Sequence, residues 1–211
     1  MSSFDNIYLP VSLGESIDKL TILDIKLSNI TDDRRNDVQK EYDLIYEKVK
    51  DFVKQYSGLY ESMKKVNVLI WEFMDVLRDG IISDDEYSKL SRKTIEFNDI
   101  RFRIKKKINF VSGSLLREQK GYKVTRILVD IGDSIQSVDP FVRPIQYFSM
   151  LYDQVIIRYS GSVNHMFNDD TIIFVNTIRD DMEFKYRFKF ETAKNVLDIF
   201  GVDEQTMSTI L

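Results

Sequence analysis

The stretch Ser83–Ser112 (SDDEYSKLSRKTIEFNDIRFRIKKKINFVS) decides the architecture of the first half of the chain. It opens with Ser83 three residues before Glu86, the pattern of a capping box at a helix N-terminus, and Ser12 and Glu15 repeat that spacing. Its seam residues recur at alternating intervals of three and four, which is typical of helices packed side by side as in a coiled coil. These seam residues are Tyr87, Leu90, Thr94, Phe97, Arg101, Ile104, Ile108 and Val111.

Three more helices with a related spacing of apolar residues are predicted before this stretch. The first begins at Ser12, the second near Thr31 and the third after Gly58. The turns at Gly58 and Gly80 are short, so successive helices are expected to run antiparallel to one another. Residues 12–112 are therefore predicted to form an elongated, antiparallel four-helix bundle with coiled-coil-like packing.

The pattern changes after Gly121 to short apolar runs separated by helical segments. Buried strands are expected at residues 123–131, 154–159 and 171–175, with a helix starting at Asp139-Pro140 between the first two. Strands that alternate with helices are typical of βαβ units and a parallel sheet. About three parallel strands amount to half of a doubly wound, Rossmann-like sheet.

Residues 183–190 fit two structures. The aromatic residues of this stretch alternate with basic ones, as in an edge strand. A helical repeat that starts at Tyr186 and continues to Phe200 fits as well, and Gly201 then stands where a helix stops. The helix is the favoured prediction, and the strand remains the alternative.

The predicted fold is therefore α+β in two parts. A helical bundle occupies residues 1–120, and a small α/β module with a half-Rossmann sheet occupies residues 121–211. No linker rich in Pro, Gly or Ser separates them, so the two parts are expected to pack together.

Composition excludes several classes of function. The chain has 211 residues, 43% of them hydrophobic, so a buried core is possible. Cysteine is absent and His165 is the only histidine, which excludes a disulfide scaffold, a thiol nucleophile and a zinc site built on thiolates or several histidines. No apolar run approaches a membrane span, and no signal peptide is expected, so the predicted location is the cytoplasm. The net charge of −4 argues against nucleic acid as a partner.

The run Arg101–Lys107 holds five cations in seven residues. A phosphate-binding or nucleic-acid-binding stripe is one interpretation. A helix distributes seven residues around two turns, however, so these charges do not share one face. The favoured interpretation is a solvated face of the bundle with one buried ion pair at Arg101.

Polar residues also lie on or beside the helical seams. Carboxylates gathered inside a bundle can hold a metal, but Glu-x-x-His pairs are absent, so neither a metal nor a cofactor is expected. A buried network that fixes the register of the helices is the favoured interpretation. Its candidate members are Glu15, Asp18, Lys19, Trp71, Asp75, Arg78, Asn98, Asp99 and Arg101.

The turn Gly132-Asp133-Ser134 directly follows the first predicted strand. Ligands of open parallel sheets bind outside the carboxyl ends of the strands, where Asp133 could serve as a general base. An ordinary βα turn is the simpler interpretation, because Gly, Asp and Ser all favour turns. No glycine-rich phosphate motif is present, so an anion would rely on helix N-termini with Arg143 or Arg158.

The first half of the chain carries three motifs in order. They are residues 10–23 (PVSLGESIDKLTIL), then Val66-Asn67 with Trp71, Asp75 and Arg78, and then residues 98–101 (NDIR) with Lys105, Ile108, Asn109 and residues 114–122. Together they resemble a small, uncharacterised helical family of bacteria and large viruses, often encoded near glycosyltransferase and nucleotide-sugar genes. The resemblance covers residues 8–122 and implies a helical fold and a genomic neighbourhood.

A second resemblance concerns the other half. Residues 126–136, 140–143 and 155–157 resemble the start of heptosyltransferase-type glycosyltransferases, in which a strand ends in a Gly-Asp turn. The resemblance implies that Asp133 occupies the position of the proposed catalytic base. Those enzymes have a second Rossmann domain that binds the nucleotide sugar, whereas only 90 residues follow Gly121. The match therefore implies a half that binds or docks.

Three functions remain as expectations. The favoured one is a non-catalytic or accessory protein of glycan or nucleotide-sugar metabolism, whose helical scaffold presents a small module to a protein partner, a nucleotide sugar or a sugar phosphate. The second is a self-associating structural protein, which could be viral and would pair through its heptad seams. The third is a glycosyltransferase with Asp133 as base, with Gly132, Ser134, Arg143 and Arg158 around the ligand.

Overall fold

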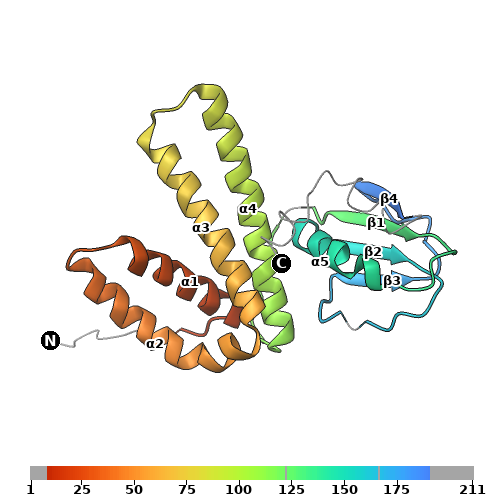
Figure 1. The fold of residues 1–211 in the computed structure, drawn as a ribbon, viewed down its shortest axis with the longest axis horizontal. Coiled ribbons are helices and arrows are strands. Elements are labelled where there is room, and N and C mark those ends of the chain that lie inside the picture. Colours follow the sequence, from red (N-terminus) through yellow and green to blue (C-terminus); the bar gives the residue numbers. More distant parts are fainter. Residues whose placement is uncertain (1–8, 122, 166, 191–211) are drawn as a thin grey trace.

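The computed structural model describes residues 9–121, 123–165 and 167–190 and shows the predicted α+β layout in two parts (Figure 1). The helices are α1 (Leu13–Asn29), α2 (Arg34–Gln55), α3 (Ser57–Asp79), α4 (Asp84–Val111) and α5 (Val142–Leu151), the last preceded by the 3-10 turn η1 (Asp139–Phe141). The strands are β1 (Arg126–Ile131), β2 (Gln154–Arg158), β3 (Ile172–Val175) and β4 (Tyr186–Phe190).

The first four helices form two antiparallel hairpins, α1–α2 and α3–α4 (Figure 1). Their shared core lies where α1 meets α3 and α4, and both hairpins diverge outward from it, so the outer part of α3–α4 stands apart from α1 and α2. Gly80 closes α3 in a left-handed conformation with φ 66°, which favours glycine. The residues of this core with 0–1% exposure are Ile17, Leu20, Met63, Val66, Ile104 and Ile108.

The two predicted capping boxes differ in the structure. At α4, Ser83 accepts from the Glu86 amide and Glu86 bonds back to Ser83, which is the complete reciprocal motif. At α1, Ser12 accepts from the Glu15 amide at 3.1 Å, but the Glu15 carboxylate turns to Lys105 on α4. A tertiary ion pair therefore replaces the second half of the predicted motif at α1.

Within the described residues, the sheet has four parallel strands in the order β3-β2-β1-β4. The helix α5 joins β1 to β2 and covers one face of the sheet. Phe141 and Phe148 stack on Phe190 and Phe188 of β4, with ring centroids 5.2 Å apart in both pairs. Alternate residues of every strand thus enter a single core beneath α5.

The favoured prediction of a helix across residues 186–190 is wrong, and the edge strand is correct. Phe188 and Phe190 point toward α5 whereas Arg187 and Lys189 are exposed, an alternation that matches the two-residue period of a strand. The sheet therefore has four strands where about three were expected. The continuation of that predicted helix to Phe200 and Gly201 lies outside the described residues.

The helical part and the sheet part of the molecule pack against each other through α5. Tyr147 and Met150 of α5 belong to the core of the helical part, and α5 lies against α4 (Figure 1). The amino ends of the strands face the helices, because Thr125 and Asp153, just before β1 and β2, lie beside Arg103 of α4. The carboxyl edge of the sheet therefore points away from the helices. Among the described helices, none combines the length and apolar character that crossing a bilayer requires.

The helix α1 comes close to α4 at Gly14, and a mutation there is expected to be costly. A Cβ at Gly14 would lie 2.7 Å from the Lys105 carbonyl oxygen and 3.0 Å from Asn109 Oδ1, so Gly14→Ala should push the helices apart and destabilise the fold by about 2 kcal/mol. Urea unfolding measures the change.

Gly58→Ala is the matched control, because a Cβ at Gly58 in the first turn of α3 would meet nothing within 4 Å. This variant should be neutral or more stable by up to about 1 kcal/mol. Equal destabilisation by both variants would show that helix propensity, and not the close approach, governs Gly14.

Candidate functional site

The basic run of α4 lies at the centre of the molecule and is paired on two sides. Arg101 and Lys105, four residues apart, face α1, whereas Arg103 and Lys107 face α5 and the sheet. All four contact carboxylates, so the prediction of a solvated face with one buried ion pair is wrong. The physical reason is the helical period, which gives each (i, i+4) pair of cations its own face and its own acidic partners.

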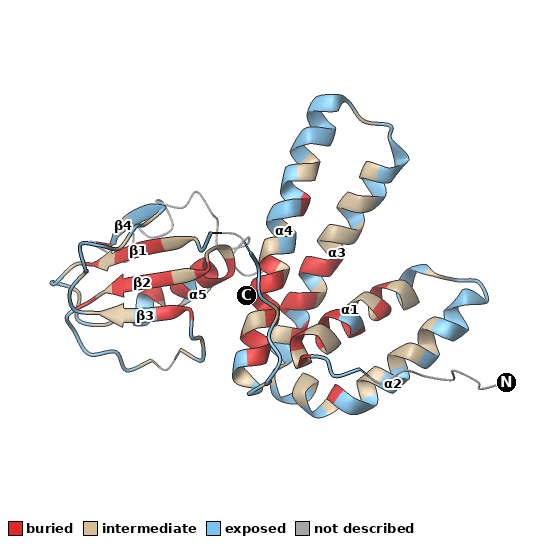
Figure 2. Cartoon of the chain, turned by 180° about the vertical axis from the view of Figure 1, so that it is seen from behind, coloured by how far each residue is buried: buried red, intermediate tan, exposed pale blue. Residues whose placement is uncertain are grey.

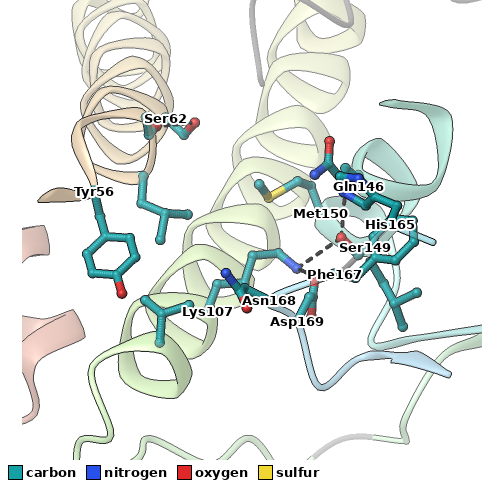
Figure 3. A pocket seen from close by; sticks show the side chains of 14 residues that line it. Tyr56, Ser62, Lys107, Gln146, Ser149, Met150, His165, Phe167, Asn168 and Asp169 are labelled. Carbon is teal, nitrogen blue, oxygen red and sulfur yellow. Dashed lines mark hydrogen bonds and ion pairs between the residues drawn. The ribbon is translucent and has the colours of Figure 1, made fainter. Parts of the chain in front are cut away.

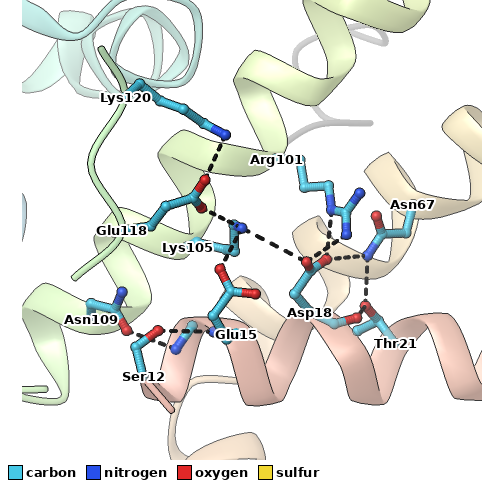
Figure 4. A network of polar contacts seen from close by, with 11 residues as sticks. Ser12, Glu15, Asp18, Thr21, Asn67, Arg101, Lys105, Asn109, Glu118 and Lys120 are labelled. Atoms are coloured by element: carbon cyan, nitrogen blue, oxygen red, sulfur yellow. Dashed lines mark hydrogen bonds and ion pairs between the residues drawn. The ribbon is translucent and has the colours of Figure 1, made fainter. Parts of the chain in front are cut away.

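On the α1 side, Asp18 is the centre of a buried network (Figure 4). Arg101 donates to both carboxylate oxygens of Asp18, at 2.8 and 2.6 Å, and Asn67 Nδ2 donates to Asp18 Oδ1 at 2.8 Å. The same amide nitrogen donates to Thr21 Oγ1 at 2.8 Å. Burial by itself would lower the pKa of the Arg101 guanidinium. Its hydrogen bonds to Asp18 and the Asp18 charge have the larger combined effect, so the pKa is raised. The network joins α1, α3 and α4.

Lys105 extends this network toward the connection after α4 (Figure 4). Its ammonium lies 2.7 Å from Glu15 Oε1 and 2.5 Å from Glu118 Oε2, and Glu118 also contacts Lys120. Burial by itself would lower the pKa of the Lys105 ammonium. Its bonds to Glu118 and Glu15 have the larger combined effect, so the pKa is raised. Nearby, the Gly14 amide donates to Asn109 Oδ1 at 2.7 Å.

The structure places only some of the predicted network residues together. Glu15, Asp18 and Arg101 belong to the network, while Lys19 pairs with Glu41 on the surface. For Asp75 and Arg78 the prediction of a buried network is wrong, because they form an exposed pair 4.0 Å apart within α3. Of the remaining candidates, Asn98 is exposed and donates to the Thr94 carbonyl, and Trp71 and Asp99 are half-buried.

On the other side of α4, Arg103 binds the start of β2. Its Nε donates to Asp153 Oδ1 at 3.1 Å, and Asp153 Oδ2 accepts from the amide and the hydroxyl of Thr125, both at 2.8 Å. Burial raises the pKa of the Asp153 carboxyl, but the Thr125 bonds and the Arg103 charge outweigh it and lower the pKa overall. This pair fixes the helical part to the sheet.

Lys107 forms the second contact of this kind, at the wall of a pocket (Figure 3). Its ammonium donates to Ser149 Oγ of α5 at 2.9 Å and pairs with Asp169, which also accepts from the Thr171 amide. Burial lowers the pKa of Lys107 despite its acidic partner. Burial also raises the pKa of Asp169, but the charge and bond of Lys107 and the bonds of Thr171 lower it overall.

The pocket has a volume of about 470 Å³ and lies between the two parts of the molecule. We call it the junction pocket. Figure 3 shows Tyr56 and Ser62 on one side and Lys107, Ser149 and Asp169 on the other. Its size falls within the range of about 300–1,000 Å³ that is usual for small-molecule sites. The full lining is Tyr56, Gly58, Leu59, Ser62, Lys107, Val111, Gln146, Ser149, Met150, His165, Phe167, Asn168, Asp169 and Ile172.

Three polar side chains of the junction pocket have unused hydrogen-bonding capacity. In the described part of the chain, the amides of Gln146 and Asn168 and the imidazole of His165 form no side-chain hydrogen bond, although His165 contacts the ring of Phe167. An amide or imidazole that faces a pocket can donate and accept at once. The pocket therefore offers directional groups beside one internally neutralised ion pair.

The predicted ligand residues at the carboxyl edge of the sheet are mostly engaged elsewhere. Asp133 is exposed and accepts from Ser160 Oγ at 3.1 Å, and the Gly132 amide donates to the Phe190 carbonyl at 2.9 Å. Arg158 donates to both carboxylate oxygens of Asp130 at 2.9 and 2.7 Å. Ser134 and Arg143 are exposed. The junction pocket instead includes Asp169 and Ile172, at the amino end of β3, whereas this turn follows the carboxyl end of β1.

Sequence reasoning missed the residues that face the junction. The sequence predicts a solvated position for Arg103 and Lys107, and it does not mark Asp153 or Asp169 as their partners. One signal was present: the cations recur at (i, i+4) on two separate faces, Asp153 immediately precedes the predicted strand at 154–159, and Asp169 lies two residues before the one at 171–175. Among the described residues, no group of three His, Asp or Glu side chains is arranged to hold a metal ion.

Comparison with known proteins identifies a family but no characterised relative. No curated protein and no solved structure matches the chain. The family described as "Family of unknown function (DUF6165)" matches residues 7–137, a range that includes α1 to α4, β1 and the Gly132-Asp133 turn. Because this match covers more than half of the 211 residues, the protein belongs to the DUF6165 family.

Proposed function

We propose that the protein is a non-catalytic accessory protein of glycan metabolism that binds a small, neutral, polyhydroxylated ligand of the sugar class in the junction pocket. The observation that carries this proposal is the lining of the pocket. Groups from α4, α5 and the segment before β3 converge on it, and several retain free hydrogen-bonding capacity.

The charge of the lining favours a neutral ligand. Among the lining residues that the structure describes, Lys107 is the only lysine or arginine, and Asp169 already neutralises that cation. A phosphate group buried here would meet no unpaired Lys or Arg among the described lining residues, and burial of an uncompensated anion is costly. This argues against the phosphate end of a sugar phosphate as the group that enters the pocket.

The mixture of planar polar and apolar groups favours hydroxyl-rich molecules. Gln146 and Asn168 offer donors and acceptors in flat groups, which suit pairs of adjacent hydroxyls. Leu59, Phe167 and other apolar residues of the lining supply a surface for the C–H face of a sugar ring. The resemblance to a family encoded near nucleotide-sugar genes supports the same ligand class.

The two charged groups of the pocket, Lys107 and Asp169, bind to other protein groups, which favours a role in ligand binding over catalysis. Lys107 donates to Ser149 and Asp169, and Asp169 also accepts from Thr171, so both groups hold the two parts of the protein together. A ligand in this pocket would contact both parts at once and would stabilise their arrangement. That coupling suits a protein that reports or presents a sugar to a partner.

Thermal unfolding with a panel of ligands tests the proposal. Neutral mono- and disaccharides should raise the midpoint in a saturable way, by about 5–10 °C at a hundredfold excess over Kd, because binding then adds about 2.7 kcal/mol. Sugar phosphates and nucleotide sugars should bind no more tightly than the matching free sugar. The variant Gln146→Ala should weaken binding about tenfold through the loss of one hydrogen bond.

Two variants make the result specific. Gln136→Ala, in the exposed turn that follows the carboxyl end of β1, is the matched control and should bind as the unmodified protein does. Asp133→Asn should also leave binding unchanged. The proposal fails if no sugar shifts the midpoint at millimolar concentration, or if Asp133→Asn abolishes binding while Gln146→Ala does not.

A further inference from the structure

The outer part of the α3–α4 hairpin, residues 70–97, is a two-helix projection that we call the arm (Figure 2). Every residue of the arm is described, and only Thr94 among them is buried. Large apolar residues are nevertheless frequent there, and Ile81 and Ile95 are 89% and 64% exposed. The other exposed or half-buried apolar residues are Ile70, Trp71, Phe73, Met74, Val76, Leu77, Ile82, Tyr87, Leu90 and Phe97.

The arm cannot bury these residues by itself. The rings of Phe73 and Phe97, whose centroids are 5.5 Å apart, close the seam between its helices. Beyond this contact the run from Val66 to Leu77 is apolar at most positions, so α3 presents apolar groups on more sides than α4 can cover. Two helices with an exposed apolar flank are typical of one half of a four-helix interface.

One flank of the arm carries a shallow groove of about 240 Å³. Its apolar floor consists of Val76, Ile82 and Leu90, and its charged rim consists of Glu86, Lys89 and Lys93. An apolar floor with a charged rim is the usual composition of a protein interface. The groove is thus suited to a helix with apolar residues and with charges that match this rim.

The charge order along α4 identifies the fitting partner. The first turn is acidic, with Asp84, Asp85 and Glu86, and the next two turns carry Lys89, Arg92 and Lys93; all six are exposed. When two such helices lie antiparallel about an axis near residues 89–90, the acidic first turn of each lies at the level of residues 93–95 of the other, a stretch that begins with Lys93. Glu86 then lies opposite Lys93 of the second copy, and the contact is the same in both directions, as a twofold interface requires.

We infer that the arm is a homodimerisation surface at which the α4 helices of two copies pair antiparallel, with Leu90 near the twofold axis and Glu86 opposite Lys93. The inference is independent of the junction pocket, which lies at the other end of α4. The paired segments are about 20 Å long, which gives an interface at the small end of the known range. The dimer should therefore be weak and concentration-dependent, and salt should weaken it further.

Sedimentation velocity from low to high micromolar protein tests this inference, with circular dichroism to confirm that each variant is folded. The unmodified chain should shift from monomer to dimer as concentration rises. Lys93→Glu places like charges opposite each other and should weaken the dimer about tenfold or more. Lys48→Glu, the same change at an exposed site of α2, is the control and should leave the dimer intact.

A mixing experiment identifies the register. Glu86→Lys alone should also fail to dimerise, but an equimolar mixture of Glu86→Lys and Lys93→Glu restores both opposite-charge contacts and should form a heterodimer. A strict monomer at every concentration, or a dimer that Lys93→Glu leaves unchanged, would overturn the inference. Lys93 takes no part in the capping box, so its variant decides the matter even if Glu86→Lys unfolds α4.

Discussion

The variant Asp18→Asn is expected to destabilise the protein by about 3 kcal/mol. It leaves Arg101 without the carboxylate that now accepts two of its hydrogen bonds, and it places a second amide against Asn67. The Asp18 side chain is 4% exposed, but Arg101 keeps 26% of its side chain exposed and can be partly hydrated, which limits the cost. Urea unfolding, with a fall in the thermal midpoint of about 6–12 °C, measures it.

Asp75→Asn is the matched control for this experiment. It removes the same charge from an ion pair on α3 in which both partners are exposed, so stability should change by less than about 0.5 kcal/mol. Similar losses in the two variants would mean that net charge, and not the buried network, determines the result. A loss below about 1 kcal/mol at Asp18 would contradict the role assigned to the network.

The second large effect is expected from Arg103→Ala, at about 3–4 kcal/mol. The change leaves the buried Asp153 carboxylate without its cation and removes a donor to the Met150 carbonyl. Because Arg103 lies on α4 and Asp153 precedes β2, both parts of the molecule should loosen. Hydrogen exchange should accelerate in α4, in α5 and at the amino ends of β1 and β2.

Arg179→Ala serves as the control here, since Arg179 pairs with Asp181 on the surface and both are largely exposed. It should leave exchange rates in both parts unchanged. A double-mutant cycle between Arg103→Ala and Asp153→Asn should show strong non-additivity, because the two changes remove the same interaction. Additive losses, or faster exchange confined to one part, would show that this pair does not join the two parts.

Much of the fold could be predicted from local patterns. The 3.5-residue period and the turn glycines located α1 to α4, and the short apolar runs located β1, β2 and β3, because these patterns report which side of an element is buried. Membership of a family without an assigned function also agrees with the prediction. The contacts that α4 makes with Gly14 and with α5 could not be predicted in this way, because tertiary contacts have no local signature.

The errors have physical causes as well. The aromatic stretch around Tyr186 fits both the two-residue period of a strand and the period of a helix. The strand forms because Phe141 and Phe148, which are distant in sequence, stack on β4. The basic run of α4 resembled a surface because the acids that neutralise it, such as Asp153 and Asp169, follow it by dozens of residues. The helical spacing of the basic residues does not reveal acidic partners that only tertiary packing brings close.

The candidate site was the least predictable feature. The Gly132-Asp133 turn follows a strand and was therefore predictable as a ligand site, yet the junction pocket forms near the amino ends of the strands, from four segments distant in sequence: residues 56–62, 107–111, 146–150 and 165–172. His165 and Gln146 had no recognisable motif around them. A pocket assembled between two parts of a chain depends on how those parts dock, and that docking depends here on Lys107 and Arg103.

The helix α5 supplies part of the helical core but lies beyond the residues by which the family is matched. The matched range ends at residue 137, but Tyr147 and Met150, which complete the core, and β2 and β4, which flank β1, come later in the chain. A parallel strand without neighbours has no partners for its backbone groups. The block of sequence by which relatives are detected is therefore shorter than the unit that must fold together, and any relative trimmed to that block would lack part of its own interior.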